Sequence, residues 1–254
     1  MKIITEHMDR WKTAGILLLI VAIVGIIDNS FVTWVFFGAI YLIAFYEATR
    51  LFEATETRLF LYAILIWIAA GLYPHPSDIL LFALVIFASS LAYYRKIEIQ
   101  GFLPLLYPTV GMLFIWMMYL GYGMGSLIWI LGIVALTDVG AFFVGKAIGK
   151  TKFCETSPNK TLEGVVGGVI AGTIGGSIVA VSLMDISFLA ALVISLLAAK
   201  TSIFGDLFES YLKRRAGVKD SGSILPGHGG VLDRIDGYLF AGVVMFVLLQ
   251  VFGY

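Results

Sequence analysis

Long apolar runs alternate with short polar segments along the chain, and this pattern predicts a bundle of helices. The runs cover residues 13–27, 31–46, 59–73, 79–94, 101–121, 126–145, 165–184, 187–212 and 235–253. They are long enough for helices and lack the strict alternation of strands, which disfavours a β-barrel. Because a helix needs about 20 apolar residues to cross a bilayer, we expect an all-α polytopic membrane protein with about nine transmembrane helices. Residues 13–46 leave a re-entrant hairpin open as an alternative.

Composition supports a membrane protein. Of the 254 residues 60% are hydrophobic and 13% are charged, with a mean hydropathy of +0.97, whereas a soluble domain carries about a quarter charged residues. The single cysteine, Cys154, excludes an intramolecular disulfide framework, and zero net charge indicates no nucleic-acid partner. We expect one integral membrane domain over 1–254, with undiagnostic N-terminal helices in 1–125 and a catalytic half in 126–254.

The positive charges predict the orientation. All of the 17 Lys and Arg except Lys200 fall in 1–12, 47–58, 95–100, 146–164 and 213–234, which alternate with loops that contain neither residue. Under the positive-inside rule these segments face the cytoplasm. No small-residue cleavage site follows the basic start and first apolar run, so we expect an uncleaved first span. We therefore expect the N-terminus and the catalytic loops to be cytoplasmic.

Small residues mark the run at 165–184. Gly164, Gly168, Gly172 and Gly176 recur every four residues and line one face of a helix. Such a stripe allows a neighbouring helix to approach closely. It therefore predicts tight helix packing and no ligand role.

Acidic residues inside apolar runs are candidates for function, because a charge in a bilayer is costly. Asp206 and Glu209 share a polar helical stripe with Ser202, Ser210 and Lys213. A structural alternative is that either acid pairs with Lys213 or Lys200. Asp138 lies similarly in the run 126–145, where function and helix–helix pairing are equally open.

Two inner segments combine charges with helix signals. In 157–164, Ser157 before Pro158 suits a helix N-cap, and a helix N-terminus beside Lys160 is a ready anion site. In 210–236, five Lys and Arg are interleaved with Asp220, Asp233 and Asp236 among five glycines. The positive-inside rule explains each Lys or Arg by itself, and helix capping explains Asp233. Neither explains why acids and bases are interleaved along the segment. Carboxylates hold Mg²⁺ while cations neutralise phosphate, so the pattern predicts a site for a metal–polyphosphate complex.

The segment 210–236 resembles the C-terminal pattern of the phosphatidate cytidylyltransferases. That pattern has Ser, a hydrophobic residue, Lys-Arg and Lys-Asp, followed by Pro-x-His-Gly-Gly-x-x-Asp-Arg-x-Asp. It is matched, with its spacing, by Ser210, Leu212, Lys213, Arg214, Lys219, Asp220, Pro226, His228, Gly229, Gly230, Asp233, Arg234 and Asp236. The stretches SPNKTLEG and GDLFES also resemble upstream motifs of the family.

The resemblance implies conversion of CTP and phosphatidate to CDP-diacylglycerol and pyrophosphate, with Mg²⁺ as cofactor. It implies Asp206 and Asp233 as principal metal ligands, and Asp236, one helical turn later, is expected to join or orient them. The residues expected in catalysis are Asp206, Asp233, Lys213, Arg234 and His228. Those expected to bind substrate are Ser157, Asn159, Lys160, Glu163, Ser210, Arg214, Lys219, Asp220, Gly229 and Gly230. The expected location is a prokaryotic inner membrane with the site facing the cytoplasm, and a homodimer is left open.

Two other functions fit parts of the pattern. A CTP-dependent kinase of a lipid alcohol, such as polyprenol or phytol, would transfer the γ-phosphoryl group and release CDP. Its alcohol would need a base, for which His228 is a candidate. An ion-coupled transporter would use the intramembrane acids, but such sites lie near the midplane between repeats. Here the polar residues cluster near one surface and no internal repeat is evident.

Overall fold

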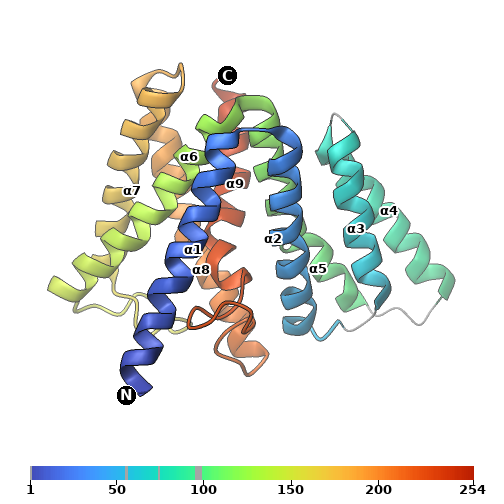
Figure 1. The fold of residues 1–254 in the computed structure, drawn as a ribbon, viewed down its shortest axis with the longest axis horizontal. Coiled ribbons are helices and arrows are strands. Elements are labelled where there is room, and N and C mark those ends of the chain that lie inside the picture. The colour runs from blue at the N-terminus through green and yellow to red at the C-terminus, as the bar shows by residue number, and fades with distance from the viewer. Residues whose placement is uncertain (1, 55–56, 74, 95–98) are drawn as a thin grey trace. The chain divides into compact units, whose positions relative to one another are not determined.

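The computed structural model describes residues 2–54, 57–73, 75–94 and 99–254, with the backbone alone for residues 2–11, 77, 94 and 99. Its helices are α1 (Lys2–Ile27), α2 (Ser30–Leu51), α3 (Thr57–Leu72), α4 (Pro76–Tyr94), η1 (Ile99–Gly101), α5 (Phe102–Leu106), α6 (Thr109–Ile148), α7 (Leu162–Leu183), α8 (Phe188–Arg215) and α9 (Leu232–Val251) (Figure 1). Within these residues there is no β-strand, only two isolated bridges. The predicted all-α class is confirmed. Four of the Lys and Arg residues used to predict the orientation, Lys2, Arg10, Arg95 and Lys96, lie outside the described side chains.

The predicted apolar runs lie in helical structure over most of their length. Five helical segments of the described chain are long and apolar enough to cross a membrane, namely Ser30–Leu51, Phe102–Ile148, Leu162–Leu183, Phe188–Arg215 and Leu232–Val251. Three shorter apolar helices cover Lys12–Ile27, Thr57–Leu72 and Asp78–Tyr93. A helical membrane protein is therefore supported, whereas nine spans stay a prediction.

A backbone break divides α6. Gly123 has φ 70° and ψ −170°, in a region that glycine enters without the steric cost of a side chain. The Ser126 hydroxyl contacts the carbonyl oxygens of Gly123 at 2.8 Å and Met118 at 3.1 Å. It thereby satisfies backbone acceptors beside the break. The break falls in the segment that separates the predicted runs 101–121 and 126–145.

The chain forms two compact units, and the first comprises Met1–Trp116 and Arg215–Ile235. Helices α2, α3 and α4 lie side by side in it (Figure 1). The indole N–H of Trp34 donates to the carbonyl oxygen of Trp67, and that of Trp67 donates to Trp34, each at 3.1 Å. Gly38 lies against the Trp67 ring and Gly71 against the Trp34 ring, where a Cβ would overlap the indole. These reciprocal contacts join α2 to α3.

The second unit comprises Met117–Arg214 and Asp236–Tyr254. Its core is built from α6, α7, α8 and α9 and includes the fully buried Trp129, Ile133, Ile194 and Met245. The Trp129 indole N–H donates to the Ser195 hydroxyl at 2.9 Å. The one polar group of the largest core side chain is therefore satisfied.

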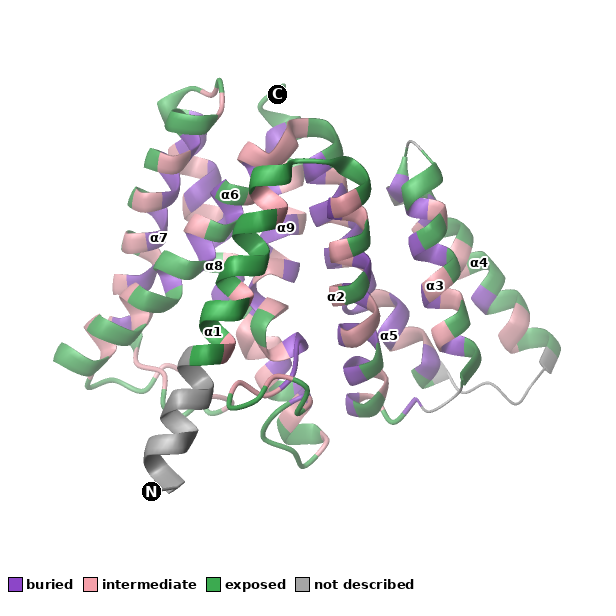
Figure 2. Cartoon of the chain, in the orientation of Figure 1, coloured by how far each residue is buried: buried purple, intermediate pink, exposed green. Residues whose placement is uncertain are grey.

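The glycine stripe of α7 packs against its neighbours. Gly164, Gly168, Gly172 and Gly176 are all buried, and the buried positions of α7 are visible in Figure 2. A Cβ at Gly168 or Gly172 would meet backbone carbonyl oxygens of α6, and one at Gly176 would meet Ser195 of α8. The predicted role of the stripe in close helix packing is confirmed.

Candidate active site

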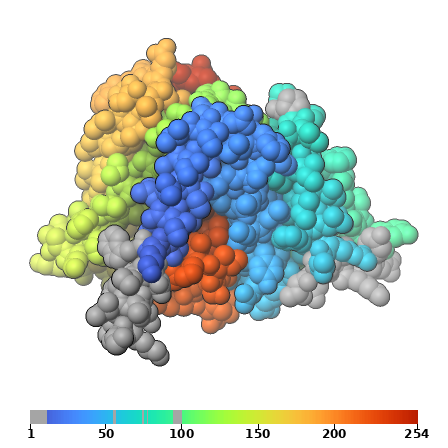
Figure 3. Space-filling view, viewed as in Figure 1, coloured from blue at the N-terminus to red at the C-terminus, as the bar shows by residue number. Residues whose placement is uncertain are grey.

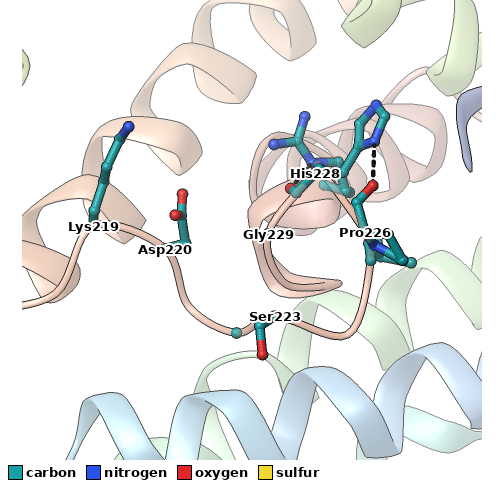
Figure 4. A pocket seen from close by; sticks show the side chains of 10 residues that line it. Lys219, Asp220, Ser223, Pro226, His228 and Gly229 are labelled. Atoms are coloured by element: carbon teal, nitrogen blue, oxygen red, sulfur yellow. Dashed lines mark hydrogen bonds between the residues drawn. The ribbon is translucent and has the colours of Figure 1, made fainter. Parts of the chain in front are cut away.

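The loop between α8 and α9, residues 216–231, forms an open cavity in the first unit. The cavity has a volume of about 570 Å³ and is lined by Lys219, Asp220, Gly222, Ser223, Leu225, Pro226, Gly227, His228, Gly229 and Arg234. The loop, orange in Figure 3, lies at the surface beside the blue helix α1. Figure 4 shows Lys219 and Asp220 on one side of the hollow and His228 with Pro226 on the other. Five of the predicted site residues therefore meet here.

Glycines give the loop its tight turn. Gly227 and Gly229 have φ of 73° and 83°, values that side-chain-bearing residues rarely adopt. The turn is closed by hydrogen bonds from the Leu225 N–H to the Gly229 carbonyl at 3.0 Å and from the His228 N–H to the Leu225 carbonyl at 2.9 Å. The turn places His228 at the wall of the cavity.

The cavity wall is rich in cations. Lys219 and Arg234 are exposed, and the Arg234 Nε–H donates to the His228 carbonyl at 3.1 Å, which leaves the rest of the guanidinium for other partners. The His228 ring contacts the Pro226 carbonyl through Nδ1 at 3.4 Å. A carbonyl oxygen only accepts, so Nδ1 is the donor in this contact and Nε2 is left as the second polar atom. This charge pattern suits a polyphosphate.

Asp233, in the first turn of α9, lies next to Gly229 of the cavity wall. Its Oδ2 accepts hydrogen bonds from the Ser221 N–H at 3.0 Å and from the Gly230 N–H at 2.8 Å. A Cβ on Gly229 would also crowd this oxygen. Asp233 therefore ties both ends of the loop to the start of α9. Its predicted role as a metal ligand stays a prediction.

Sequence reasoning missed Glu47, the residue that holds the loop from α2. The carboxylate is 1% exposed and accepts from the Val231 N–H at 3.1 Å, the Leu232 N–H at 2.7 Å and the Ser221 hydroxyl at 3.2 Å. The predicted run ended at residue 46, which assigned Glu47 to a polar loop, whereas α2 continues to Leu51. The sequence did carry one signal, because Glu47 directly follows the apolar run 31–46 and an acid next to such a run is a candidate for function.

Thr13 is a second contact that the sequence did not indicate. Its hydroxyl donates to the Pro226 carbonyl at 3.1 Å and so joins α1 to the wall of the cavity. Thr13 and Pro226 are both uncharged, and 213 positions separate them in the chain. No pattern in the sequence marks this pair.

The second unit brings together another set of predicted residues around Asp206. The Lys160 ammonium forms an ion pair with the Asp206 carboxylate. The Ser210 hydroxyl donates to Asp206 Oδ1 at 3.3 Å, one turn along α8. Asp236, in α9, interacts electrostatically with Asp206 and also contacts Glu209. Two acids therefore interact electrostatically, and one of them pairs with a lysine.

Two glycines allow α8 and α9 to bring these acids together. A Cβ on Gly205 would overlap the carbonyl oxygen of Asp236. A Cβ on Gly237 would lie 3.3 Å from the Ser202 carbonyl oxygen and close to its side chain. Each glycine is adjacent in sequence to one acid of the pair, Gly205 to Asp206 and Gly237 to Asp236. The close helix crossing therefore sets the separation of the two carboxylates.

Glu209 follows the structural alternative given above. It is fully buried and forms an ion pair with Lys213 at 2.9 Å, one turn along α8. Asp206 pairs with Lys160 rather than with Lys200, which is exposed. The role predicted for Lys213 in catalysis stays a prediction.

The loop before α7 differs from the prediction in its cap. The N-cap of α7 is Thr161, whose Oγ1 accepts from the Gly164 N–H at 3.2 Å. The prediction of Ser157 as N-cap is therefore wrong. Residues 157–160 form a turn instead, closed by a hydrogen bond from the Lys160 N–H to the Ser157 carbonyl at 3.0 Å.

Other predicted substrate-binding residues lie at the edges of this group. Glu163 accepts from the Thr151 hydroxyl at 2.8 Å and the Lys150 N–H at 3.1 Å, so its carboxylate organises the loop. Asn159 and Arg214 are exposed. Their predicted contacts with substrate stay predictions, as does the role of Asp138.

The carboxylate oxygens of the second unit are the type of ligand that magnesium prefers. Within the described residues no group of three or more His, Cys, Asp or Glu side chains is assembled to hold a metal. Magnesium is usually held in proteins by one or two carboxylates, with substrate phosphates and waters completing its shell. Asp206 and Asp236, which interact electrostatically, supply two such carboxyl groups.

The predicted residues fall in the two units. Those in the first unit are Lys219, Asp220, His228, Gly229, Gly230, Asp233 and Arg234, and those in the second are Ser157, Asn159, Lys160, Glu163, Asp206, Ser210, Lys213, Arg214 and Asp236.

A helical membrane protein with a cation-rich, glycine-shaped loop is typical of an enzyme that handles phosphate esters at a bilayer. The sequence matches the model of the cytidylyltransferase family over residues 8–252, and the chain belongs to this family. The family predicted from residues 210–236 is confirmed.

Curated relatives match most of the chain. A phosphatidate cytidylyltransferase of Helicobacter pylori strain J99 is 44% identical over 245 residues, which cover 96% of this chain and 92% of the relative. One of Thermotoga maritima is 34% identical over 232 residues, covering 84% and 86%. One of Bacillus subtilis is 40% identical over 158 residues, covering 60% and 59%.

Proposed function

We propose that this protein transfers the cytidylyl group of CTP to phosphatidate, giving CDP-diacylglycerol and pyrophosphate. The observation that carries the proposal is the 44% identity, over nearly the whole length of both chains, to a phosphatidate cytidylyltransferase. The cation-lined cavity adds independent support, because a triphosphate needs such surroundings.

The reaction is an in-line displacement at the α-phosphorus of CTP. An oxygen of the lipid phosphate forms a bond to this phosphorus, and the bond to the bridging oxygen of the β-phosphate breaks, so pyrophosphate leaves with the electron pair. A phosphate monoester has a second pKa near 6. The nucleophile is thus ionised at neutral pH, and no general base is required. The main barrier is the repulsion between two polyanions.

The residues of the cavity wall act on that barrier. Lys219 and Arg234 bind phosphate oxygens, and His228 contacts a phosphate or leaving oxygen from the opposite wall. Gly229 leaves room for the nucleotide to approach the backbone. Lys160 is a further residue that the sequence predicts to bind phosphate.

Magnesium is the proposed cofactor, with Asp206 and Asp236 as carboxylates of the second unit that suit it. Asp233 stays a predicted ligand on the strength of the family pattern. When bound, the metal neutralises phosphate charge and favours departure of pyrophosphate. Asp206 and Asp236 offer carboxylate oxygens for it, and the Ser210 hydroxyl keeps Asp206 Oδ1 oriented.

The membrane arrangement belongs to the same proposal. The chain crosses the membrane about nine times, with the N-terminus and the loops 146–164 and 213–234 on the cytoplasmic side, where CTP is found. The one-sided Lys and Arg distribution supports this orientation. The bacterial sources of the relatives favour an inner membrane. The acyl chains of the substrate stay in the bilayer during the reaction.

An assay with γ-labelled CTP distinguishes the proposed transferase from the lipid-alcohol kinase. Purified protein is supplied with Mg²⁺ and an equimolar mixture of phosphatidate and a polyprenol. Transfer of the cytidylyl group places the label in pyrophosphate and leaves the lipids unlabelled. Label in a polyprenyl phosphate would overturn the proposal in favour of the kinase.

A further inference from the structure

We infer that Glu47, from the N-terminal half of the chain, is a positioning residue that holds the loop 216–231 and its junction with α9 in the shape that binds the nucleotide. The inference rests on the proposed function, since it takes CTP as the ligand of the cavity. Glu47 lies outside the cavity lining and contacts the loop from behind. It therefore acts through the loop and not on the substrate.

The burial of Glu47 is the first argument. Among the described residues, Glu47 and Glu209 are the two buried carboxylates, and a buried carboxylate is costly unless it is well hydrogen-bonded. Three donors satisfy Glu47, namely the Val231 N–H, the Leu232 N–H and the Ser221 hydroxyl. Because two of them lie in the loop 216–231 and the third is at its junction with α9, the carboxylate constrains the loop itself.

The start of α9 is the second argument. The N–H groups at a helix N-terminus lack partners within the helix and carry partial positive charge. Glu47 accepts from the N–H of Leu232, the first residue of α9, and from that of Val231 just before it, while Asp233 accepts from the loop N–H groups of Gly230 and Ser221. These four backbone donors are thus occupied by protein carboxylates. The phosphates are left to the side chains of Lys219, Arg234 and His228.

Ser221 connects the two carboxylates. Its N–H donates to Asp233 and its hydroxyl donates to Glu47. A displacement of Glu47 therefore moves Ser221 and, with it, a hydrogen bond of Asp233. Ser221 directly follows Asp220 of the cavity wall, so the same displacement changes the positions of Asp220 and Lys219.

Two glycines close the loop around the carboxylate. A Cβ on Gly222 would overlap the Glu47 carboxylate, and a Cβ on Gly230 would overlap both that carboxylate and the Ser221 hydroxyl. Gly230 belongs to the His-Gly-Gly motif. Its lack of a side chain is explained here by close contact with Glu47 and Ser221, since Gly222 and Gly230 are not in the left-handed region.

The test compares Glu47→Gln and Ser221→Ala with the matched control Glu53→Gln in the full-length protein. Glu53 is an exposed glutamate of the same inner segment and is outside the site. A glutamine keeps the shape of Glu47 but replaces one carboxylate oxygen by an amide N–H₂. That group cannot accept a hydrogen bond, so at least one donor of the loop loses its acceptor. Calorimetry gives the dissociation constant of CTP for each variant, and steady-state kinetics give the KM values for CTP and phosphatidate. Thermal unfolding of each variant shows whether it is folded under the assay conditions.

We expect Glu47→Gln to weaken CTP binding and to raise the KM for CTP by about tenfold or more, since hydrogen bonds to a charged acceptor are lost. The KM for phosphatidate stays within about twofold. Ser221→Ala has a smaller effect in the same direction, and Glu53→Gln matches the wild type. A folded Glu47→Gln protein with wild-type CTP affinity would overturn the inference.

Two further outcomes are decisive. If Glu47→Gln does not fold, Ser221→Ala decides, because it removes one donor and leaves both backbone contacts; an unchanged CTP affinity in this variant would contradict the inference. If the wild type binds CTP but forms no CDP-diacylglycerol, the proposed function is wrong. The comparison of CTP affinities then still tests the role of Glu47 separately.

Discussion

Lys160 and Asp206 form an ion pair that links the loop before α7 to α8. Their side chains are 26% and 36% exposed, so the pair is neither sealed in the core nor fully in solvent. Asp206 also faces the carboxylate of Asp236. The lysine therefore neutralises Asp206, and it occupies a position in which it competes with the proposed metal ion for that carboxylate.

Replacing Lys160 separates these two effects. We expect Lys160→Met to lower kcat at least about tenfold, because a cation that offsets phosphate charge is lost. The half-saturating Mg²⁺ concentration should not rise, because Asp206 loses a competing cation. Steady-state rates over a Mg²⁺ titration measure both quantities. Lys152→Met, an exposed lysine of the same loop, is the control. Normal turnover, or a defect that excess Mg²⁺ repairs, would contradict this account.

The buried pair of Lys213 and Glu209 allows stability to be separated from catalysis. Lys213→Met removes the ion-pair partner of the buried Glu209 carboxylate, which costs about 3–5 kcal/mol of unfolding free energy. The double variant Lys213→Met with Glu209→Gln should regain most of that stability but not the activity, because Lys213 is predicted to act on substrate. Thermal unfolding and the rate per folded molecule test this. Full activity in the double variant would assign Lys213 a purely structural role.

Gly205 provides a test of the helix crossing. A methyl group at this position meets the backbone carbonyl of Asp236, which cannot move without shifting α9. We expect Gly205→Ala to lower the unfolding free energy by about 1–3 kcal/mol and to reduce turnover by separating Asp206 from Asp236. In the control Gly175→Ala, the methyl group meets only the end of the flexible Leu136 side chain. Equal effects of the two variants on turnover would refute the importance of this crossing.

The predicted metal carboxylates are tested by isosteric amides. Asp206→Asn and Asp233→Asn should each reduce CDP-diacylglycerol formation about a hundredfold or more, because an amide is a weak ligand for a hard cation. Asp233→Asn should also loosen the loop, since an amide N–H₂ can replace the oxygen that faces the Ser221 and Gly230 N–H groups. Membrane protein levels and product formation are measured together, with the exposed Asp185→Asn as control. Near-normal turnover in either variant would remove that residue from the metal site.

Much of the fold was predictable from the sequence because lipid-facing helices require long apolar runs. Most helices lie where the runs predicted them, but the run 101–121 is divided between α5 and α6, and α6 continues through the run 126–145. The glycine stripe of α7 packs as its spacing indicated. Helix ends were harder to predict, because polar residues continue a helix past the apolar run. The five-residue extension of α2 beyond residue 46 explains why Glu47 was overlooked.

The local motif of the candidate site was also predictable, since the cavity wall comes from one continuous segment. Lys219, His228 and Arg234 lie within 16 residues of one another in sequence and line the same cavity. Contacts from distant segments were not predictable. Thr13 with Pro226 and Glu47 with Leu232 join residues that no periodicity or spacing connects. Capping was ambiguous because Ser157 and Thr161 both have the chemistry of an N-cap, and only the backbone course selects Thr161.

The most direct test of the central claim uses CTP labelled at the α-phosphate. The purified protein is incubated with this nucleotide, Mg²⁺ and phosphatidate in mixed micelles, and lipid and aqueous phases are separated. We predict that the label enters the lipid phase as CDP-diacylglycerol, with one pyrophosphate released for each lipid labelled, and that Asp206→Asn abolishes the transfer. Label that stays in the aqueous phase as CDP, with a newly phosphorylated lipid, would contradict the account.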